Sequence, residues 1–215
     1  AESLVQSTLE LDPTGLIHDS FSGSREHITR QRRYSGRAEV PATGLHVYGS
    51  EWSLLEDALQ LQQAGAAFRL LPASLSQIER LTKEAIAMRR GDSYRGVRHN
   101  VQKTWPALME SLERQGLQSL IARFERGFST HDLSLLQDAQ AQDGTQEVTL
   151  GLIEHAKNLE AGRVVLRDCC FDVQLGQRSY MPSRAAYLAI TRARHEVWMP
   201  SDALDRLAVL QQRHT

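Results

Sequence analysis

Two strand patterns on either side of one amphipathic helix constrain the fold of this chain most. Residues 45–49 are mostly apolar and end at a glycine, and residues 66–71 are mostly apolar and precede Pro72. The segment between them carries an apolar stripe at helical spacing, with Ser50 as a helix cap and Gly65 as a stop. A strand, a helix and a strand in so short a span are typical of a βαβ unit, which predicts a parallel sheet.

The sequence changes character after the second strand. The capping-box pattern Ser74-Leu75-Ser76-Gln77 predicts the start of a helix that ends near Gly91. Further helices are predicted at 101–114, 117–126 and 132–141. Because no strand pattern occurs between residues 74 and 144, we expect this stretch to be an all-helical insertion.

Strand patterns return after the helical stretch. They are predicted at 147–153, 164–166 and 197–199. Pro182 can occupy the first turn of a helix that runs to about His195, and Ser201 begins a final helix that runs to about Arg213. The expected fold class is therefore α/β, with a mainly parallel sheet flanked by helices and interrupted by an all-helical inserted subdomain.

Composition excludes several classes of function. With 25 Lys and Arg against 26 Asp and Glu, the chain is unlike histone-type binders of polyanions. It has no apolar run of the roughly 18 residues that span a bilayer and no signal peptide, so we expect no membrane partner and a cytoplasmic location. Its two cysteines, Cys169 and Cys170, are adjacent, so no structural disulfide is expected between them. No spacing typical of a zinc site occurs.

The most specific motif is Tyr187-Leu188-Ala189-Ile190-Thr191-Arg192-Ala193-Arg194. Upstream of it lies His155-Ala156-Lys157-Asn158-Leu159-Glu160. Together they resemble the last two motifs of UvrD/Rep-type superfamily I DNA helicases, T-x-H-x-A-K-G-L-E and Y-V-A-[VL]-T-R-A-[KR]. The resemblance implies a second RecA-like domain made of residues 1–73 and 145–215, with residues 74–144 as its helical insertion.

The resemblance also implies roles for single residues. Arg192 matches the arginine that reaches the γ-phosphate of ATP, Thr191 matches the threonine before it, and Arg194 takes a Lys/Arg position. A guanidinium is always charged and forks onto phosphate oxygens, so it can neutralise charge that develops during phosphoryl transfer. Glu160 matches a residue that approaches the ATP ribose, and Lys157 is a candidate contact to DNA.

Several positions depart from the family pattern. The threonine and histidine that help the family to hold single-stranded DNA are Leu152 and Glu154 here, and a glutamate repels phosphate. Ser22 stands where a second phosphate-sensing arginine is expected. The chain also lacks a G-x-x-x-x-G-K-[ST] loop and an Asp-Glu pair for Mg²⁺. We therefore expect ATP with Mg²⁺ as a cofactor only together with a missing P-loop domain, and no ATP hydrolysis by this chain alone.

A basic cluster lies near the N-terminus. It comprises Arg30, Arg32, Arg33 and Arg37, with Tyr34 inside it. The arginines could clamp a nucleic-acid backbone while the tyrosine stacks on a base; the alternative is a solvated helix face beside a loop. The three tryptophans lie on apolar stripes and are expected in the core: Trp52, Trp105 and Trp198.

Two functions remain open. The first is the C-terminal motor half of an ATP-dependent superfamily I DNA helicase, which contributes an arginine finger and part of the single-stranded DNA path. Its partners are then single-stranded DNA and an N-terminal P-loop helicase domain. The alternative is a degenerate helicase-like module that acts as a non-enzymatic DNA- or protein-docking domain. The intact motif at 191–194 favours the first, and the changed DNA contacts favour the second.

Overall fold

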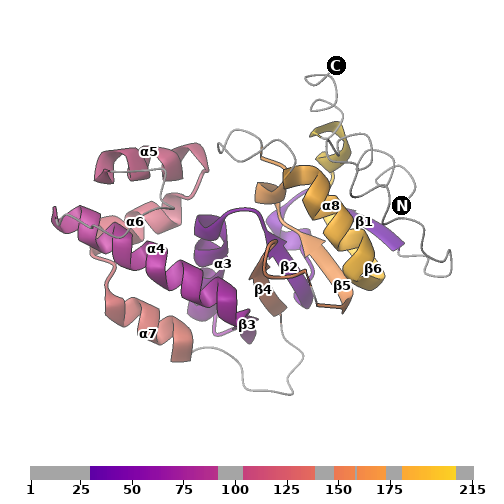
Figure 1. The fold of residues 1–215 in the computed structure, drawn as a ribbon, viewed down its shortest axis with the longest axis horizontal. Coiled ribbons are helices and arrows are strands. Elements are labelled where there is room, and N and C mark those ends of the chain that lie inside the picture. The colour runs from indigo at the N-terminus through magenta and orange to yellow at the C-terminus, as the bar shows by residue number, and fades with distance from the viewer. Residues whose placement is uncertain (1–29, 92–103, 139–147, 158, 173–180, 207–215) are drawn as a thin grey trace. The chain divides into compact units, whose positions relative to one another are not determined.

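The structure is a computed structural model that describes residues 30–91, 104–138, 148–157, 159–172 and 181–206. The described chain forms two compact units (Figure 1). Unit 1 holds the described residues up to Ser50 and from Val148 onward, and unit 2 holds those from Glu51 to Asp138. The elements of unit 1 are β1 (Arg30–Tyr34), η1 (Arg37–Glu39), β2 (Gly44–Tyr48), β4 (Val148–Leu152), β5 (Ala161–Leu166), η2 (Asp168–Cys170), α8 (Met181–Arg192) and β6 (Ala193–Pro200). The elements of unit 2 are α3 (Glu51–Gln63), β3 (Phe68–Leu70), α4 (Pro72–Arg90), α5 (Trp105–Arg114), α6 (Gln118–Arg126) and α7 (Thr130–Asp138).

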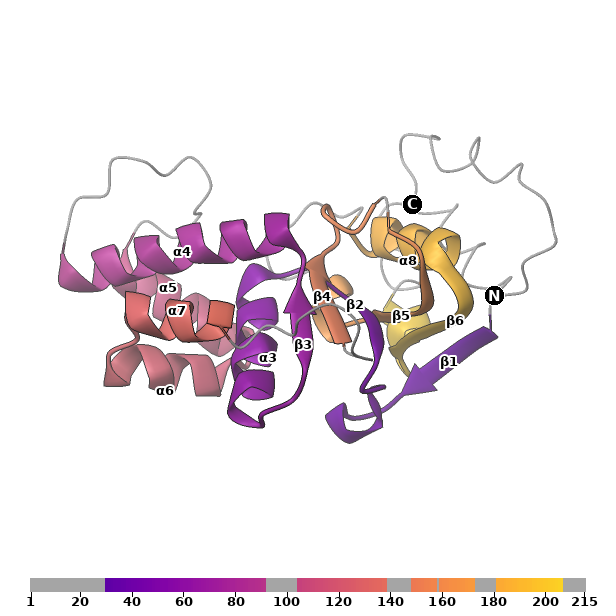
Figure 2. The same cartoon turned by 90° about the horizontal axis from the view of Figure 1, so that it is seen from below.

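Unit 1 is built on a parallel sheet. Its strands pair in parallel as β1 with β6, β6 with β5, β5 with β2 and β2 with β4. Within unit 1 the strand order is β1-β6-β5-β2-β4 (Figure 2). Val47, in the middle of β2, lies opposite Gly151 of β4 and Leu166 of β5 and is fully buried. This arrangement confirms the expected fold class, an α/β fold with a mainly parallel sheet and flanking helices.

Helix α8 packs against β5 and β6 through small side chains (Figure 1). Ala185, Ala186 and Ala189 are each 0% exposed. Alanine allows a helix backbone to approach a sheet closely. The expected helix to His195 is wrong, because α8 ends at Arg192 and the chain enters β6 without a loop.

The basic cluster forms a strand that neither interpretation of it predicted. Residues Arg30–Tyr34 are β1, at the edge of the sheet, in register with Glu196–Pro200 of β6. Tyr34 is only 3% exposed, and its hydroxyl donates to the Leu166 carbonyl at 2.7 Å. Burial raises the pKa of this phenol. The expectation that Tyr34 stacks on a base is therefore wrong, since its ring belongs to the core.

Unit 2 contains the predicted helices around an aromatic core. Trp52 and Trp105 each pack edge-on against Phe124, with ring centroids 6.0 and 5.8 Å away. The carboxylate of Glu56 accepts hydrogen bonds from the Ser119 hydroxyl at 2.6 Å and the Leu120 amide at 3.3 Å, which anchors the start of α6. The parts of the predicted helices at 101–103, 139–141 and 207–213 lie outside the described residues.

Helix α4 begins earlier than its capping-box pattern predicted. The first helical residue is Pro72, after Leu71 as N-cap, and no side chain caps the helix. Proline suits the first helical position because its missing N–H would have no helical partner there. Ser74 is therefore a buried residue of the first turn rather than a cap, and the Ser76 hydroxyl donates to the Pro72 carbonyl.

Compact unit 2 includes α3 and β3 together with the helices that follow them. Helix α3 packs against both α4 and α7, which is why residues 51–70 group with the helices. The division into a sheet domain of residues 1–73 and 145–215 and an insertion of residues 74–144 stays a prediction.

Among the helices described, none is both long enough and apolar enough to cross a membrane.

Candidate functional site

The first strand residues of β5 and β6 lie side by side. Ala161 of β5 pairs with Ala193 of β6, and each follows directly on a residue of the two motifs singled out in the sequence. Glu160 precedes β5, Arg192 ends α8, and Arg194 is the second residue of β6. The structure therefore brings together Glu160, Arg192 and Arg194, which we name the amino-edge cluster.

Within the amino-edge cluster, Arg194 is paired with Glu160. Its Nη2 and Nε donate to the Oε2 of Glu160 at 2.8 and 3.1 Å. Both side chains are largely in water, with 65% and 55% of their surface exposed. Exposed ion pairs contribute only about 0–1 kcal/mol to stability, so this contact orients the two side chains more than it stabilises the fold.

Arg192 differs from its neighbour in having no acidic partner among the residues that the structure describes. Its side chain is half-buried at the C-terminal end of α8. Such an arginine keeps its charge and its donors for an anion from outside the described structure. The hydroxyl of Thr191, in contrast, lies 2.9 Å from the Tyr187 carbonyl and 3.2 Å from the Leu188 carbonyl, so it is engaged within its own helix.

A second charged group occupies one face of the sheet beside the amino-edge cluster. Glu196 of β6 accepts hydrogen bonds on Oε2 from Trp198 Nε1 at 3.1 Å and from Arg163 Nε at 2.9 Å, and Arg32 Nε lies 3.9 Å from its Oε1. The indole hydrogen bond and the neighbouring Arg163 hold the pKa of Glu196 below its usual range. Arg163 also donates to the Thr43 hydroxyl at 3.0 Å.

Three side chains of this second group, Arg163, Glu196 and Trp198, hold one another in place. The Arg163 guanidinium lies over the Trp198 ring, 5.9 Å from its centroid. That ring face is therefore covered by a cation that is itself held by Glu196. Trp198 packs within the protein, in keeping with its expected structural role, although it is half-buried rather than fully buried.

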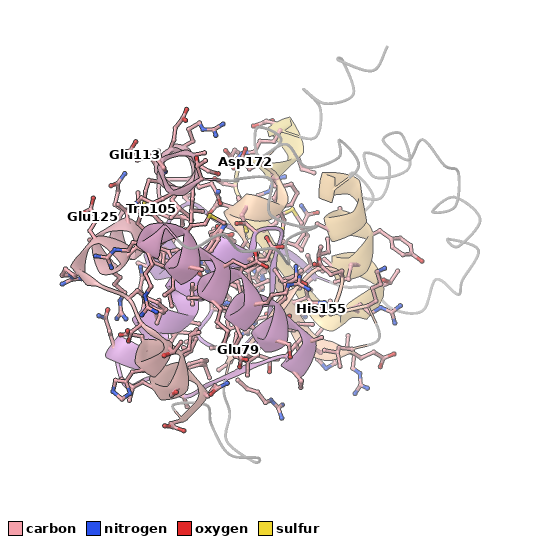
Figure 3. All side chains as sticks on the ribbon, turned by 60° about the vertical axis from the view of Figure 1, so that its left-hand side comes forward. Glu79, Trp105, Glu113, Glu125, His155 and Asp172 are labelled. Atoms are coloured by element: carbon pink, nitrogen blue, oxygen red, sulfur yellow. The ribbon has the colours of Figure 1, made fainter. Side chains whose placement is uncertain are left out.

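The predicted DNA contacts lie on different elements of unit 1. Lys157 is exposed in the connection between β4 and β5, where Figure 3 labels His155. Arg30, Arg32 and Arg33 are exposed on β1. Lys157 and these arginines are basic positions on separate elements, and Ser22 lies outside the described residues.

Sequence reasoning missed the opposite edge of the sheet, where β2 and β5 end. The Gly49 amide donates to Cys169 Sγ at 3.3 Å, and the Cys170 thiol donates to the Val47 carbonyl at 3.2 Å. A Cβ added at Gly49 would lie 2.6 Å from the Cys169 carbonyl oxygen, so only glycine fits. The available signals were a glycine directly after one buried strand and a cysteine pair shortly after another, but the sequence does not show that these strands are neighbours.

One buried titratable group lies between the two edges. His46 of β2 is 5% exposed, and burial lowers its pKa from 6.5 to about 3. Its ring hydrogen-bonds to the backbone of Pro41, while its Nε2 has no partner among the residues described. The ring is neutral at physiological pH and belongs to the core.

Comparisons with known proteins leave the chain without a family. No protein-family model matches it, and no curated protein matches it either. Within the described residues, no group of three or more His, Cys, Asp or Glu side chains could hold a metal ion. The motifs and the geometry of the two sheet edges are therefore the features that indicate a function.

Proposed function

We propose that this chain is the C-terminal motor half of an ATP-dependent superfamily I DNA helicase. In this role Arg192 supplies an arginine finger to ATP bound on a separate P-loop domain. The chain also contributes part of a single-stranded DNA path and does not hydrolyse ATP alone. The proposal combines the motif resemblance with the parallel sheet and the amino-edge cluster.

The observation that carries the proposal is the difference between two arginines that only Ala193 separates. Arg194 is paired with Glu160, whereas Arg192 has no acidic partner within the described part of the chain. A structural arginine is ordinarily satisfied by carboxylates or carbonyls, while an arginine finger must keep its donors for phosphate. The arginine that matches the family finger is the one of the two without an acidic partner.

The residues present fit part of an ATP site. Arg192 can contact phosphate oxygens, and Glu160 at the same sheet edge can accept a hydrogen bond from a ribose hydroxyl. When bound, ATP with Mg²⁺ would supply the phosphoryl group. Holding the β-phosphate and the metal needs backbone amides and a lysine that this chain lacks, so that task falls to the partner domain.

The most direct test uses a protein in which a P-loop domain precedes this chain in the same reading frame. Arg192→Ala should lower DNA-stimulated ATP hydrolysis by about 10³–10⁵-fold, the usual contribution of an arginine finger. Arg194→Ala, two positions along the chain, is the matched control and should cost far less. Equal losses in the two variants would contradict the assignment. For the isolated chain we expect no turnover above a blank, and turnover that Arg192→Ala abolishes would reveal a phosphate site within it.

Binding of single-stranded DNA gives a second test on the isolated chain. Fluorescence anisotropy of a labelled oligonucleotide should show weak binding that falls steeply as salt rises, because phosphate contacts release counterions. Arg32→Glu/Arg33→Glu should weaken it further. Absence of binding at low salt would count against the DNA path. Tight, salt-resistant binding that these substitutions leave unchanged would place the DNA site elsewhere.

A second candidate function has an observation of its own. Leu152, at the family's DNA-contacting threonine position, is 1% exposed inside β4, and Glu154 is exposed where the family has histidine. Both changes remove contacts to a nucleic-acid backbone. They favour a helicase-like module that docks on DNA or protein without catalysis. ATP hydrolysis that Arg192→Ala leaves unchanged would support it, and absence of DNA binding as well would leave protein as the docking partner.

A further inference from the structure

The chain's two cysteines lie at the carboxyl edge of the unit 1 sheet with different surroundings. Both belong to η2, directly after β5, and neither forms a disulfide in the structure. Cys169 is partly exposed, whereas Cys170 is 1% exposed. Their thiols also interact with each other. Redox-sensing cysteines are reachable from solvent and often lie next to a second cysteine that resolves the oxidised product.

The hydrogen bonds give the two sulfurs different chemical roles. Cys169 Sγ accepts the Gly49 N–H, and a donor that points at sulfur favours the thiolate, which is the nucleophilic form. Cys170 Sγ donates to the Val47 carbonyl, which favours the protonated thiol. Burial acts in the same direction and raises the pKa of Cys170. Cys169 is thus suited to react first, whereas Cys170 can react with the product only as it gives up its proton, which the departing hydroxyl can take up as water.

The thiol pair lies where parallel sheets commonly bind small molecules. β2 and β5 are neighbours. β6, which follows β5 in the chain, lies beyond β5, and β4, the next strand of unit 1 after β2, lies beyond β2 on the other side. A crevice outside the carboxyl ends of such strands is the usual ligand position in open α/β sheets. A small oxidant can therefore approach Cys169 from this edge.

We propose that Cys169 and Cys170 form a reversible thiol–disulfide site that is oxidised by hydroperoxides. The Cys169 thiolate attacks the peroxide, the O–O bond breaks, and Cys169 becomes a sulfenic acid while hydroxide leaves and takes up a proton. The Cys170 sulfur then attacks the Cys169 sulfur, the S–O bond breaks, and water leaves. Overall, two thiols and one hydrogen peroxide give one disulfide and two waters. A dithiol reductant reverses the reaction by thiol–disulfide exchange.

Oxidation changes the contacts between η2 and the end of β2. Cys170 loses the hydrogen that it donates to Val47, and a disulfide between adjacent residues closes a small ring through their shared peptide bond. The turn is presently held by the Cys170 amide on the Arg167 carbonyl and the Phe171 amide on the Asp168 carbonyl, both at 2.9 Å. Such a ring must distort this turn. The hydrogen bond that the Gly49 N–H donates to Cys169 Sγ then loses its present geometry.

The test uses the whole chain treated with a small excess of hydrogen peroxide. Because the chain has two cysteines in all, every intramolecular disulfide must join this pair. Intact mass should fall by two hydrogens, about 2 Da, and return after dithiothreitol. A tryptic peptide of residues 168–178 holds both cysteines and should carry the whole mass change. This wild-type measurement does not depend on any variant that might fail to fold.

Single substitutions separate the two roles. Cys169→Ser should abolish the two-hydrogen loss and leave a buried thiol that reacts slowly. Cys170→Ser should also abolish it but should accumulate sulfenic acid on Cys169, which dimedone traps. The amide of Gly49 should exchange with deuterium faster in oxidised wild-type protein. Disulfide-linked dimers, oxidation of Cys170 before Cys169, or sulfonic acid as the first product would each overturn the proposal.

Discussion

The two edges of the unit 1 sheet hold their functional groups in opposite ways. At the amino edge, Glu160 and Arg194 form an ion pair with more than half of each side chain in water, and Arg192 beside them has no acidic partner among the residues described. At the carboxyl edge, Gly49, Cys169 and Cys170 are tied together by backbone and thiol hydrogen bonds in a largely buried turn.

The difference separates positions that can change without harm to the fold from positions that cannot. Exposed charges interact through a high dielectric, so the amino edge can be changed for function at little cost in stability. Buried turns are close-packed, so the carboxyl edge tolerates almost no added volume. Substitutions at the first edge should therefore alter activity, and substitutions at the second should alter stability.

The largest expected effect on stability comes from His46, between the two edges. Burial lowers its pKa from 6.5 to about 3, so between these pH values the unfolded chain binds a proton that the folded chain does not. Stability should fall as the pH drops through this range, by at most about 1.4 kcal/mol per pH unit. His46→Leu should flatten this part of the curve in urea unfolding followed from about pH 7 to about pH 4. An unchanged slope would show that the ring is protonated in the folded state.

The next effect breaks the carboxyl edge by adding one methyl group. In Gly49→Ala the new Cβ would lie 2.6 Å from the Cys169 carbonyl oxygen and 3.1 Å from the Cys170 Cα, both of them backbone atoms. Overpacking of this kind costs about 1–3 kcal/mol, seen as a lower Tm. Gly36→Ala is the matched control, because nothing lies within 4 Å of its added Cβ and its φ of −155° suits alanine. Similar losses in both variants would rule out the close approach as the cause.

The sequence predicts the strand–helix–strand unit and the positions of most helices, because their apolar periodicity is regular. It does not predict β1, because an edge strand with arginine at three of five positions shows no apolar alternation. It also places the end of α8 too late, since the transition at Arg192 is set by pairing of Ala193 with Ala161 of β5. Helical propensity alone does not contain that contact.

The candidate sites, like the fold, are only partly predictable from the sequence. The motifs point to Glu160, Arg192 and Arg194, but only the parallel register of β5 and β6 brings them to one edge. The different partners of Arg192 and Arg194 follow from side-chain geometry that no local pattern encodes. The thiol pair depends on β2 lying beside β5, although about 120 residues separate Gly49 from Cys169.

A smaller effect is expected from Glu196, on the sheet face beside the amino edge. The Trp198 indole, Arg163 and Arg32 hold its pKa below the ordinary 4.5, so its stabilising contribution is present above that pH and is lost as the pH falls through the folded pKa. Glu196→Gln should destabilise the protein by about 1–2 kcal/mol at neutral pH, as hydrogen bonds to a charged group do. The difference from wild type should shrink in acid. A constant difference at all pH values would assign the loss to packing.

The smallest effect is expected at the amino edge itself, from the pair of Glu160 and Arg194. A double-mutant cycle with Glu160→Gln and Arg194→Ala should give a coupling of at most about 0.5 kcal/mol that declines as salt screens the charges. The two atoms that join them are only 2.8 Å apart, but both side chains are mostly in water. A coupling well above 1 kcal/mol would show that this pair is held as firmly as the hydrogen-bonded turn at the opposite edge. A weak coupling instead leaves Glu160 able to exchange its arginine for a ribose hydroxyl, as the proposed function requires.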